Sequence, residues 1–148
     1  MIIAIGCDHA GFALKEIIAN QIGKNGHKVL DLGTDNPQKS VDYPDFAAAV
    51  SRAVLEGKAD RGIVLCGSGV GACVAANKFK GIRAGLCHDT YSAAQAVQHD
   101  NVNVLCLGAR VIGPSLACAV LDAFLTSSFT NETRHVHRLE KIKALEGK

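Results

Sequence analysis

The sequence has little of several features that particular classes of protein require. Among its 148 residues there is no tryptophan, and aromatic residues make up only 5%. The sequence therefore offers few aromatic rings on which nucleic-acid bases could stack. Positive charge is not in excess either, because the formal net charge is only +2. This near balance argues against a nucleic-acid partner and against a polybasic face for membranes.

Long apolar runs and export signals are also missing. No apolar run approaches the roughly 20 residues that are needed to span a bilayer. Residues 2–5 form a short apolar segment without a preceding basic stretch, and Gly6 and Asp8 interrupt it. This pattern does not fit a secretory signal. We therefore expect no membrane segment and a cytoplasmic protein.

The chain has six cysteines but no C-x-x-C pair. A zinc ribbon or a thioredoxin-type redox motif is therefore not expected, and a protein that is not exported has no need of a disulfide framework. Free cysteines are most often small buried apolar residues. We expect this role for five of the six and a chemical role for Cys66. The other five are Cys7, Cys73, Cys87, Cys106 and Cys118.

Short apolar runs alternate with longer amphipathic segments along the chain. The length, with 48% hydrophobic and 20% charged residues, is typical of one globular domain. Continuous apolar runs predict buried parallel strands, and apolar residues at helical spacing predict helices. The predicted strands are residues 2–5, 28–32, 61–66, 83–87 and 104–107. The predicted helices are residues 12–22, 46–56 with Asp45 as N-cap, 72–78, 90–98, 114–127 and 134–145.

This alternation predicts an α/β fold. We expect one domain over residues 1–148, a Rossmann-like three-layer α/β/α sandwich with a five-stranded parallel sheet. In such a sheet, ligands bind beyond the carboxyl ends of the strands. The segments at those ends are rich in acids, histidines and glycines. They are residues 7–11, 33–44, 66–71, 87–89 and 108–110.

The strongest local feature is the segment Cys66-Gly67-Ser68-Gly69-Val70-Gly71. Glycines let successive N–H groups turn into one concavity, and the following helix adds its positive end. Such a nest binds an anion or oxyanion and favours a thiolate at its mouth. The alternative is a tight strand-to-helix turn with the cysteine in the core.

Two nucleotide-binding motifs can be compared with this loop. No Gly-Lys-Ser/Thr follows its glycines, so the loop is not a P-loop. Its glycine spacing also departs from the G-x-G-x-x-G dinucleotide fingerprint. Asp89, beyond the next strand, nevertheless stands where a ribose-binding acid would lie. A nucleotide-binding module is therefore kept as an alternative.

Histidines and acids supply further candidates. Asp8 and His9 follow the first strand, and such a pair suits the orientation of a sugar hydroxyl or the transfer of its proton. Asp8 can alternatively be a helix N-cap. His99, followed by Asp100 and Asn101, closes the fourth predicted helix, where its cation is stabilised even in a structural role.

A cationic cluster opens the last predicted helix. Arg134 and Arg138 are four residues apart on one face, and His135 is adjacent. Two guanidinium groups at a helix N-terminus suit a phosphate dianion, although a solvated cationic face is the alternative. A metal pair of His135 and His137 is not favoured, because at helical spacing the two point apart. With a thiolate base and a His/Asp pair, the cluster indicates isomerisation of a sugar phosphate.

Motifs along the whole chain resemble those of the type B ribose-5-phosphate isomerases, a family that also holds galactose-6-phosphate isomerase subunits. The matching segments, in the family's order, are residues 6–12, 41–44, 63–71, 75–78, 81–84, 98–99, 108–113 and 134–135. The resemblance implies an aldose–ketose isomerase without cofactor or metal. Its reaction would interconvert ribose 5-phosphate and ribulose 5-phosphate, in the non-oxidative pentose phosphate pathway, through a cis-enediolate.

The resemblance also implies roles for individual residues. Cys66 would move the proton between C1 and C2, and Ser68 would help to hold the enediolate oxygen. His99 would open the furanose ring with help from Asp8, and Tyr43 would lie against the sugar. The loop N–H groups implied for the enediolate are those of Gly67, Gly69 and Gly71. The residues implied for the phosphate are His9, Arg110, Arg134, His135 and Arg138.

Departures from the family pattern concern the substrate. Some members have a glutamate base where this chain has Ala72, so the chain is of the cysteine type. Members usually read His-Asn-Asp where this chain reads His99-Asp100-Asn101, and we expect both of the latter residues near the substrate. Six-carbon aldose 6-phosphates of the allose or galactose type are the alternative substrates.

The family further implies a homodimer with shared sites, in which His99 of one subunit faces Cys66 of the other. A tetramer is the alternative assembly. The galactose enzymes divide their catalytic residues between two different subunits. Because this chain carries both residues, we expect a self-sufficient homodimer.

Overall fold

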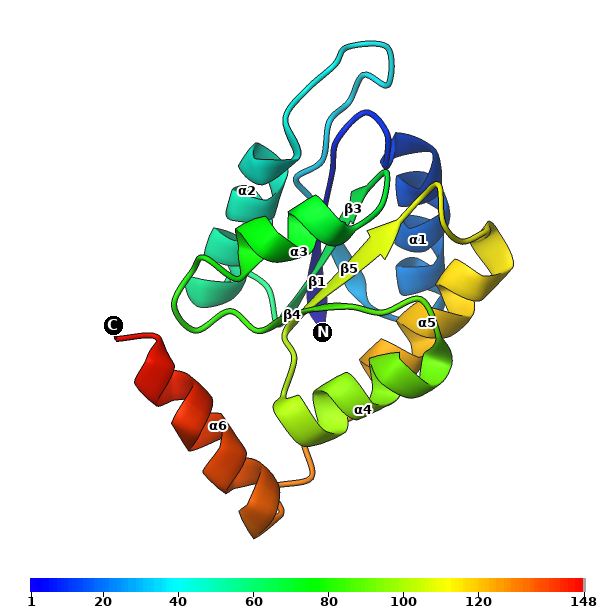
Figure 1. Ribbon diagram of the computed structural model, residues 1–148. Helices are drawn as coiled ribbons and strands as arrows, with labels where there is room; N and C mark the ends of the chain where they lie inside the picture. Colours follow the sequence, from blue (N-terminus) through cyan, green and yellow to red (C-terminus); the bar gives the residue numbers. More distant parts are fainter. Residues whose placement is uncertain (148) are drawn as a thin grey trace.

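A computed structural model describes residues 1–147 (Figure 1). Five parallel strands form one sheet in the order β2-β1-β3-β5-β4. The strands are β1 (Ile2–Cys7), β2 (Lys28–Asp31), β3 (Arg61–Cys66), β4 (Ala84–Leu86) and β5 (Val104–Gly108). The helices are α1 (Phe12–Lys24), α2 (Tyr43–Leu55), α3 (Val70–Ala76), α4 (Thr90–Asp100), α5 (Pro114–Thr126) and α6 (Thr133–Leu145). The predicted three-layer α/β/α sandwich is confirmed.

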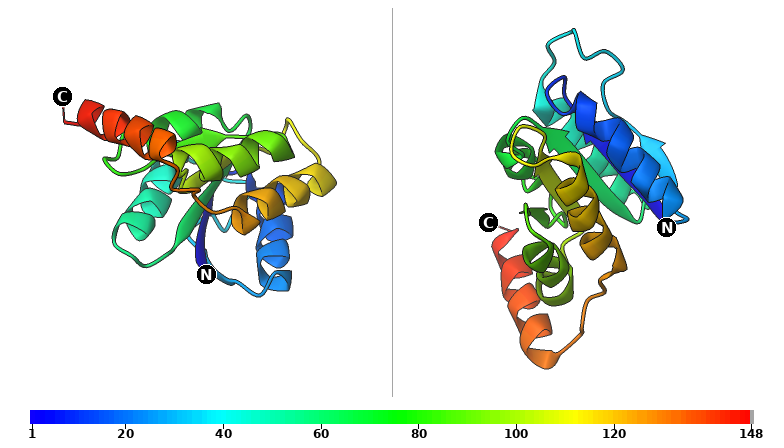
Figure 2. Two further views of the ribbon diagram at one scale, coloured as in Figure 1. Left: turned by 90° about the horizontal axis from the view of Figure 1, so that it is seen from below. Right: turned by 90° about the vertical axis from the view of Figure 1, so that its right-hand side faces the viewer.

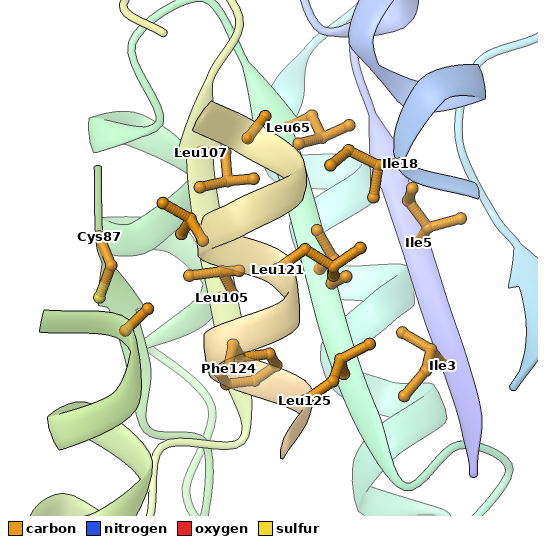
Figure 3. Packing of buried hydrophobic residues seen from close by; sticks show 14 of the residues in the cluster. Ile3, Ile5, Ile18, Leu65, Cys87, Leu105, Leu107, Leu121, Phe124 and Leu125 are labelled. Carbon is orange, nitrogen blue, oxygen red and sulfur yellow. The ribbon is translucent and has the colours of Figure 1, made fainter. Parts of the chain in front are cut away.

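The two faces of the sheet bury two separate cores. Successive side chains of a strand point to opposite faces. On β3, Ile63 and Leu65 therefore pack with α1, α4 and α5, whereas Val64 and Cys66 pack with α2 and α3. Figure 3 shows the first core, in which Phe124 of α5 is fully buried. Central strands that are buried on both sides read as continuous apolar runs, which is why the sequence predicted them.

The last helix, α6, lies outside the three layers. Figures 1 and 2 show it beside α4, projecting from the body of the molecule. Of its 13 residues, only His135 and Leu139 are buried. A helix that buries so little apolar surface is held by few contacts. Neither α6 nor any other helix within residues 1–147 is long and apolar enough to cross a membrane.

Two helix starts differ from the predictions in ways that matter for the site. α2 begins at Tyr43, because Pro44 fits the first turn of a helix, where its missing N–H costs nothing. Asp45 therefore lies in the first turn and is not the N-cap, a position that Asp42 occupies. α3 begins at Val70, inside the segment predicted as a turn. Both helices thus start closer to the glycine loop than predicted.

Candidate active site

A cavity of about 400 Å³ opens at the carboxyl edge of the sheet. This is the edge at which parallel sheets bind ligands. The lining residues are Asp8, His9, Ala10, Tyr43, Cys66, Gly67, Ser68, Gly71, Arg110 and Val111. Eight of the residues predicted from the sequence for the site are among them. We call Asp8, His9, Tyr43, Cys66, Arg110 and the loop 67–71 the carboxyl-edge cluster.

Cys66 ends β3 and is only 4% exposed. Its Sγ accepts a hydrogen bond from the N–H of Gly69 at 3.1 Å. Gly69 has a φ of +79°, and a Cβ there would lie 2.8 Å from the carbonyl carbon of Leu107, so only glycine fits. The family resemblance implies that this N–H holds the enediolate oxygen, but in the structure the tight turn directs it to the sulfur. Gly69 therefore positions the thiol and does not line the cavity.

The rest of the glycine loop carries a hydroxyl and an aromatic ring. The Ser68 Oγ accepts a hydrogen bond from the Val70 N–H at 3.2 Å. Tyr43 packs on Gly71, where a Cβ would lie 2.5 Å from the Cζ of the tyrosine. The first turn of α2 thus brings Tyr43, 40% exposed, against the loop. This placement depends on packing between α2 and α3, which the sequence does not display.

Asp8 and His9 are both held by backbone N–H groups. The buried carboxylate of Asp8 accepts a hydrogen bond from the Gly11 N–H at 2.9 Å, so it closes the turn into α1 while lining the cavity. The Nδ1 of His9 accepts a hydrogen bond from the Val41 N–H at 3.1 Å. In a neutral ring with an accepting Nδ1, the proton is on Nε2, which can donate to an anion.

Arg110 is tied to the glycine loop through the backbone. Its N–H donates to the carbonyl of Gly67 at 3.0 Å, and the Ala109 N–H donates to the carbonyl of Cys66 at 2.9 Å. Its guanidinium lies against the loop, since a Cβ at Gly67 would be 3.4 Å from Nη1. A positive charge therefore stands at one wall of the cavity, as an anionic substrate requires.

Two residues after β4 have structural roles. The Nε2 of His88 accepts a hydrogen bond from the Gly108 N–H at 2.9 Å, and burial lowers the pKa of this histidine. Asp89 is the N-cap of α4, where its carboxylate accepts the Ser92 N–H at 2.7 Å. The acid that kept the nucleotide-binding alternative open is therefore used to cap a helix.

The other predicted residues lie on a different part of the molecule. In parallel βα units the helices run back from the carboxyl edge of the sheet. His99 is in the last turn of α4 and therefore lies toward the opposite edge. In Figure 1 the carboxyl ends of β3 and β5 point upward, whereas α4 and α6 lie at the bottom. We call His99, Arg134, His135 and Arg138 the α4–α6 cluster.

Within the α4–α6 cluster, one histidine is buried and the arginines are exposed. The ring of His135, 1% exposed, stacks on that of His99 with a centroid distance of 4.1 Å and an interplanar angle of 25°. Arg134 Nε donates to the Glu132 carboxylate at 2.8 Å. Arg134 and Arg138 face solvent. His135, predicted beside them as a phosphate ligand, is instead covered by α4, because its position on α6 faces His99.

Asp100 and Asn101 also lie away from the carboxyl-edge cavity. Asp100 ends α4 beside a second cavity of about 440 Å³, which Arg83 also lines. Asn101 is the C-cap of α4 with a φ of +47°, a left-handed conformation that asparagine tolerates well. Its carbonyl accepts a hydrogen bond from Arg83 Nε at 2.8 Å. With this order of the two residues, an asparagine occupies the C-cap position of α4.

The other five cysteines were expected to be buried, and three of them, Cys7, Cys87 and Cys106, are buried, whereas Cys73 and Cys118 are half-buried. Burial raises the pKa values of Cys7 and Cys87 to about 11, as expected for packing residues. Hydrogen bonding with Cys106 instead lowers the pKa of Cys73 to about 7, against the effect of burial. Cys73 does not line the carboxyl-edge cavity. No sequence motif marks it, because its environment arises where α3 packs on β5.

Fold and site together define an enzyme-like α/β domain for acid–base chemistry on a small anion. A thiol, a carboxylate, an imidazole and a guanidinium converge on one cavity at the ligand-binding edge. The profile of the Ribose/Galactose Isomerase family matches residues 3–142. The chain belongs to this family.

Individual relatives align over most of their length. Ribose-5-phosphate isomerase B of Escherichia coli is 46% identical over 144 residues, covering 97% of this chain and 95% of the relative. D-erythrulose-4-phosphate isomerase of Pectobacterium atrosepticum is 46% identical over 127 residues, covering 86% and 84%. The solved structure of Clostridium thermocellum ribose-5-phosphate isomerase B has a TM-score of 0.96 and 46% identity, covering 99% and 98%.

Proposed function

We propose that the chain interconverts D-ribose 5-phosphate and D-ribulose 5-phosphate. The observation that carries this proposal is the convergence of Cys66, Asp8, His9 and Arg110 on one cavity. Relatives named ribose-5-phosphate isomerase B, 46% identical, support the substrate. The reaction belongs to the non-oxidative pentose phosphate pathway, and we propose that the enzyme works in the cytoplasm.

Cys66 is the base in this proposal. From the open-chain aldose it removes the proton on C2 and returns a proton to C1, while the carbonyl moves from C1 to C2. A proton beside a carbonyl is weakly acidic, so the enediolate oxygen needs donors held in place beforehand. Ser68 and the loop N–H groups of Gly67 and Gly71 lie at the cavity for this purpose. Because hydrogen moves within one molecule, no external electron acceptor is needed.

Binding of the phosphate needs positive charge from both clusters. His9 and Arg110 line the cavity and supply donors from this chain. Arg134 and Arg138 add two guanidinium groups, each able to form paired hydrogen bonds with phosphate oxygens. A firm grip on the phosphate also keeps the enediolate away from water and from elimination of phosphate. We therefore assign the four side chains to the phosphate of the substrate.

A second copy of the chain is needed to join the clusters. His99 is in the last turn of α4, and Cys66 ends β3. In Figure 1, α4 lies away from the carboxyl end of β3. We propose a homodimer in which the α4–α6 cluster of one chain completes the cavity of the other. Exposed apolar side chains support such an interface. They are Val70 (52% exposed) and Val74 (56%) on α3, Leu86 (38%) on β4 and Tyr91 (71%) on α4.

The direct test is an isomerase assay without added metal. Purified protein is given ribose 5-phosphate, and ribulose 5-phosphate is detected, with Cys66→Ala as the inactivating variant. General-base catalysis contributes roughly 10²–10⁴-fold, so we expect a loss of that order. Cys118→Ala, a change at a cysteine outside the cavity, should keep full turnover. Unchanged turnover in Cys66→Ala would refute the assigned base.

The size of the preferred sugar is tested in the same assay. The Pectobacterium relative is named for a four-carbon phosphate, and six-carbon phosphates such as allose 6-phosphate are further candidates. We expect the highest kcat/KM for the five-carbon substrate.

Size-exclusion chromatography with light scattering separates the proposed dimer from a tetramer. NAD and AMP, which should not raise the melting temperature, test the nucleotide-binding alternative.

A further inference from the structure

His135 combines burial with an absence of hydrogen bonds. Within residues 1–147, neither its Nδ1 nor its Nε2 has a hydrogen-bond partner. The nearest carboxylate, that of Glu132, lies 3.8 Å from Nε2, which is too long for a hydrogen bond. Buried polar atoms without partners reduce stability, so an apolar ring would fit this position better. The imidazole therefore calls for an explanation beyond packing.

The specific contact of this ring is with another histidine. His135 on α6 and His99 on α4 stack face to face at 4.1 Å. Burial lowers the pKa of His135, and the neighbouring His99, Arg134 and Arg138 lower it further, while Glu132 acts in the opposite direction. The lowered pKa keeps the His135 ring neutral, so it presents a flat, uncharged face to His99.

We propose that His135 is a positioning residue for the ring-opening step: its buried ring, stacked on that of His99, holds His99 in one orientation. The inference rests on the proposed function, in which His99 acts on the furanose. In that step the bond between C1 and the ring oxygen breaks. The ring oxygen gains a proton from His99, and the C1 hydroxyl loses one to Asp8. Protons and electrons balance without a co-reactant.

Ring opening is required for a five-carbon aldose phosphate but not for a four-carbon one. Ribose 5-phosphate is supplied mostly as a closed furanose. Erythrose 4-phosphate forms no such ring, because its phosphorylated O4 cannot close on C1. A defect in the orientation of His99 should therefore slow the use of ribose 5-phosphate and spare the use of erythrose 4-phosphate. A purely structural role for His135 would affect both aldoses equally.

The experiment compares two apolar replacements of the same buried ring. His135→Leu fills the space without a flat face, and His135→Phe keeps a flat ring on which the His99 ring can stack. Misplaced catalytic groups lose about 10–100-fold, so we expect this loss of kcat/KM for His135→Leu with ribose 5-phosphate. With erythrose 4-phosphate the same variant should stay within about twofold. His135→Phe should recover most of the lost rate, and exposed His137→Ala should be unchanged with both aldoses.

Melting temperatures of both replacements are measured alongside the rates. The proposal is overturned if His135→Leu loses activity equally with ribose 5-phosphate and erythrose 4-phosphate, or if it loses none with ribose 5-phosphate. If the wild type does not convert erythrose 4-phosphate, the recovery by His135→Phe decides alone. It is also overturned if His135→Phe is as slow as His135→Leu with ribose 5-phosphate. A wild-type protein that converts neither substrate would instead refute the proposed function, so the two failures are distinguishable.

Discussion

The carboxyl-edge cluster and the α4–α6 cluster hold their side chains in different ways. At the carboxyl edge, backbone N–H groups are directed at the reactive atoms of Cys66, Asp8 and His9. In the α4–α6 cluster, His99 rests on another ring, and Arg134 contacts a carboxylate in solvent. In the first arrangement, backbone hydrogen bonds fix the positions of the side-chain atoms. Proton transfer from carbon requires such precise placement. The second suits long side chains that close around a phosphate.

The two clusters also differ in what one chain can do with them. The carboxyl-edge cluster is assembled by three strands whose ends meet at one edge of the sheet. The α4–α6 cluster joins the last turn of α4 to the first two turns of α6, which lie away from this edge. In the proposed homodimer, a single chain therefore contributes to two different sites. The following experiments test this division, from the largest expected effect to the smallest.

Mixing two inactive variants should restore activity. Cys66→Ala and His99→Ala should each reduce turnover of ribose 5-phosphate by roughly 100-fold or more. If the subunits exchange at random in equal amounts, half of the dimers are mixed and carry one intact site. Activity should then recover to about a quarter of the wild-type value. No recovery after verified exchange would show that one chain supplies both residues.

Removal of the two arginines should weaken binding of the substrate. Charge-assisted hydrogen bonds contribute about 1.5–3 kcal/mol, so Arg134→Ala/Arg138→Ala should raise KM by about 10–100-fold. We expect a smaller change in kcat, measured by steady-state kinetics with ribose 5-phosphate. Lys143→Ala, on the opposite face of α6, is the matched control and should leave KM unchanged. A double variant with normal KM would place the phosphate elsewhere.

A methyl group at Gly69 should disturb the carboxyl-edge cluster specifically. The positive φ and the close approach of Leu107 should make Gly69→Ala lose about 1–3 kcal/mol of unfolding free energy. Turnover should fall as well, because the N–H that contacts Cys66 moves. Gly23→Ala, in α1, meets no atom within 4 Å and should be neutral or stabilising. Urea unfolding compares the two, and equal stability would contradict this assignment.

Acid should weaken the folded protein slightly through two histidines, one bonded to the end of β5 and one in the α4–α6 cluster. His88 and His135 have lowered pKa values in the folded protein, mainly because of burial. The unfolded chain therefore binds protons at a higher pH than the folded one, and stability falls as the pH drops below about 6.5. His88→Gln keeps an acceptor for Gly108, and His135→Phe keeps a ring. Each substitution should make the unfolding free energy, measured with urea, depend less on pH. An unchanged pH dependence in both variants would contradict the assignment.

Much of the fold could be predicted, because its signals are local. Apolar runs such as 63–66 and helical spacing such as 12–22 are properties of short segments, and the structure has strands and helices there. The helix start at Tyr43 was misplaced, although Pro44 was a usable signal. Resemblance to the isomerase family was confirmed by the match over residues 3–142. The roles of individual site residues stay predictions until the variants are measured.

Other features depend on contacts between segments that are distant in the sequence. Tyr43 meets Gly71 only because α2 and α3 pack on the same face of the sheet. The burial of His135 depends on α6 lying along α4. The lowered pKa of Cys73 arises from Cys106, which is 33 residues away on β5. Local patterns carry no information on such pairs.

By itself, the sequence determined the alternation of strands and helices, and hence a parallel sheet with its ligands at one edge. It also determined which residue types stand at that edge, since these follow directly after buried runs. Only the tertiary structure decided that the two arginines and His135 gather beside His99, away from the cavity that Cys66 lines. The reason is that α6 follows no strand: it lies outside the three layers, and its place against α4 depends on the contact between His135 and His99. Such contacts join segments that are far apart in the sequence, so no local pattern records them.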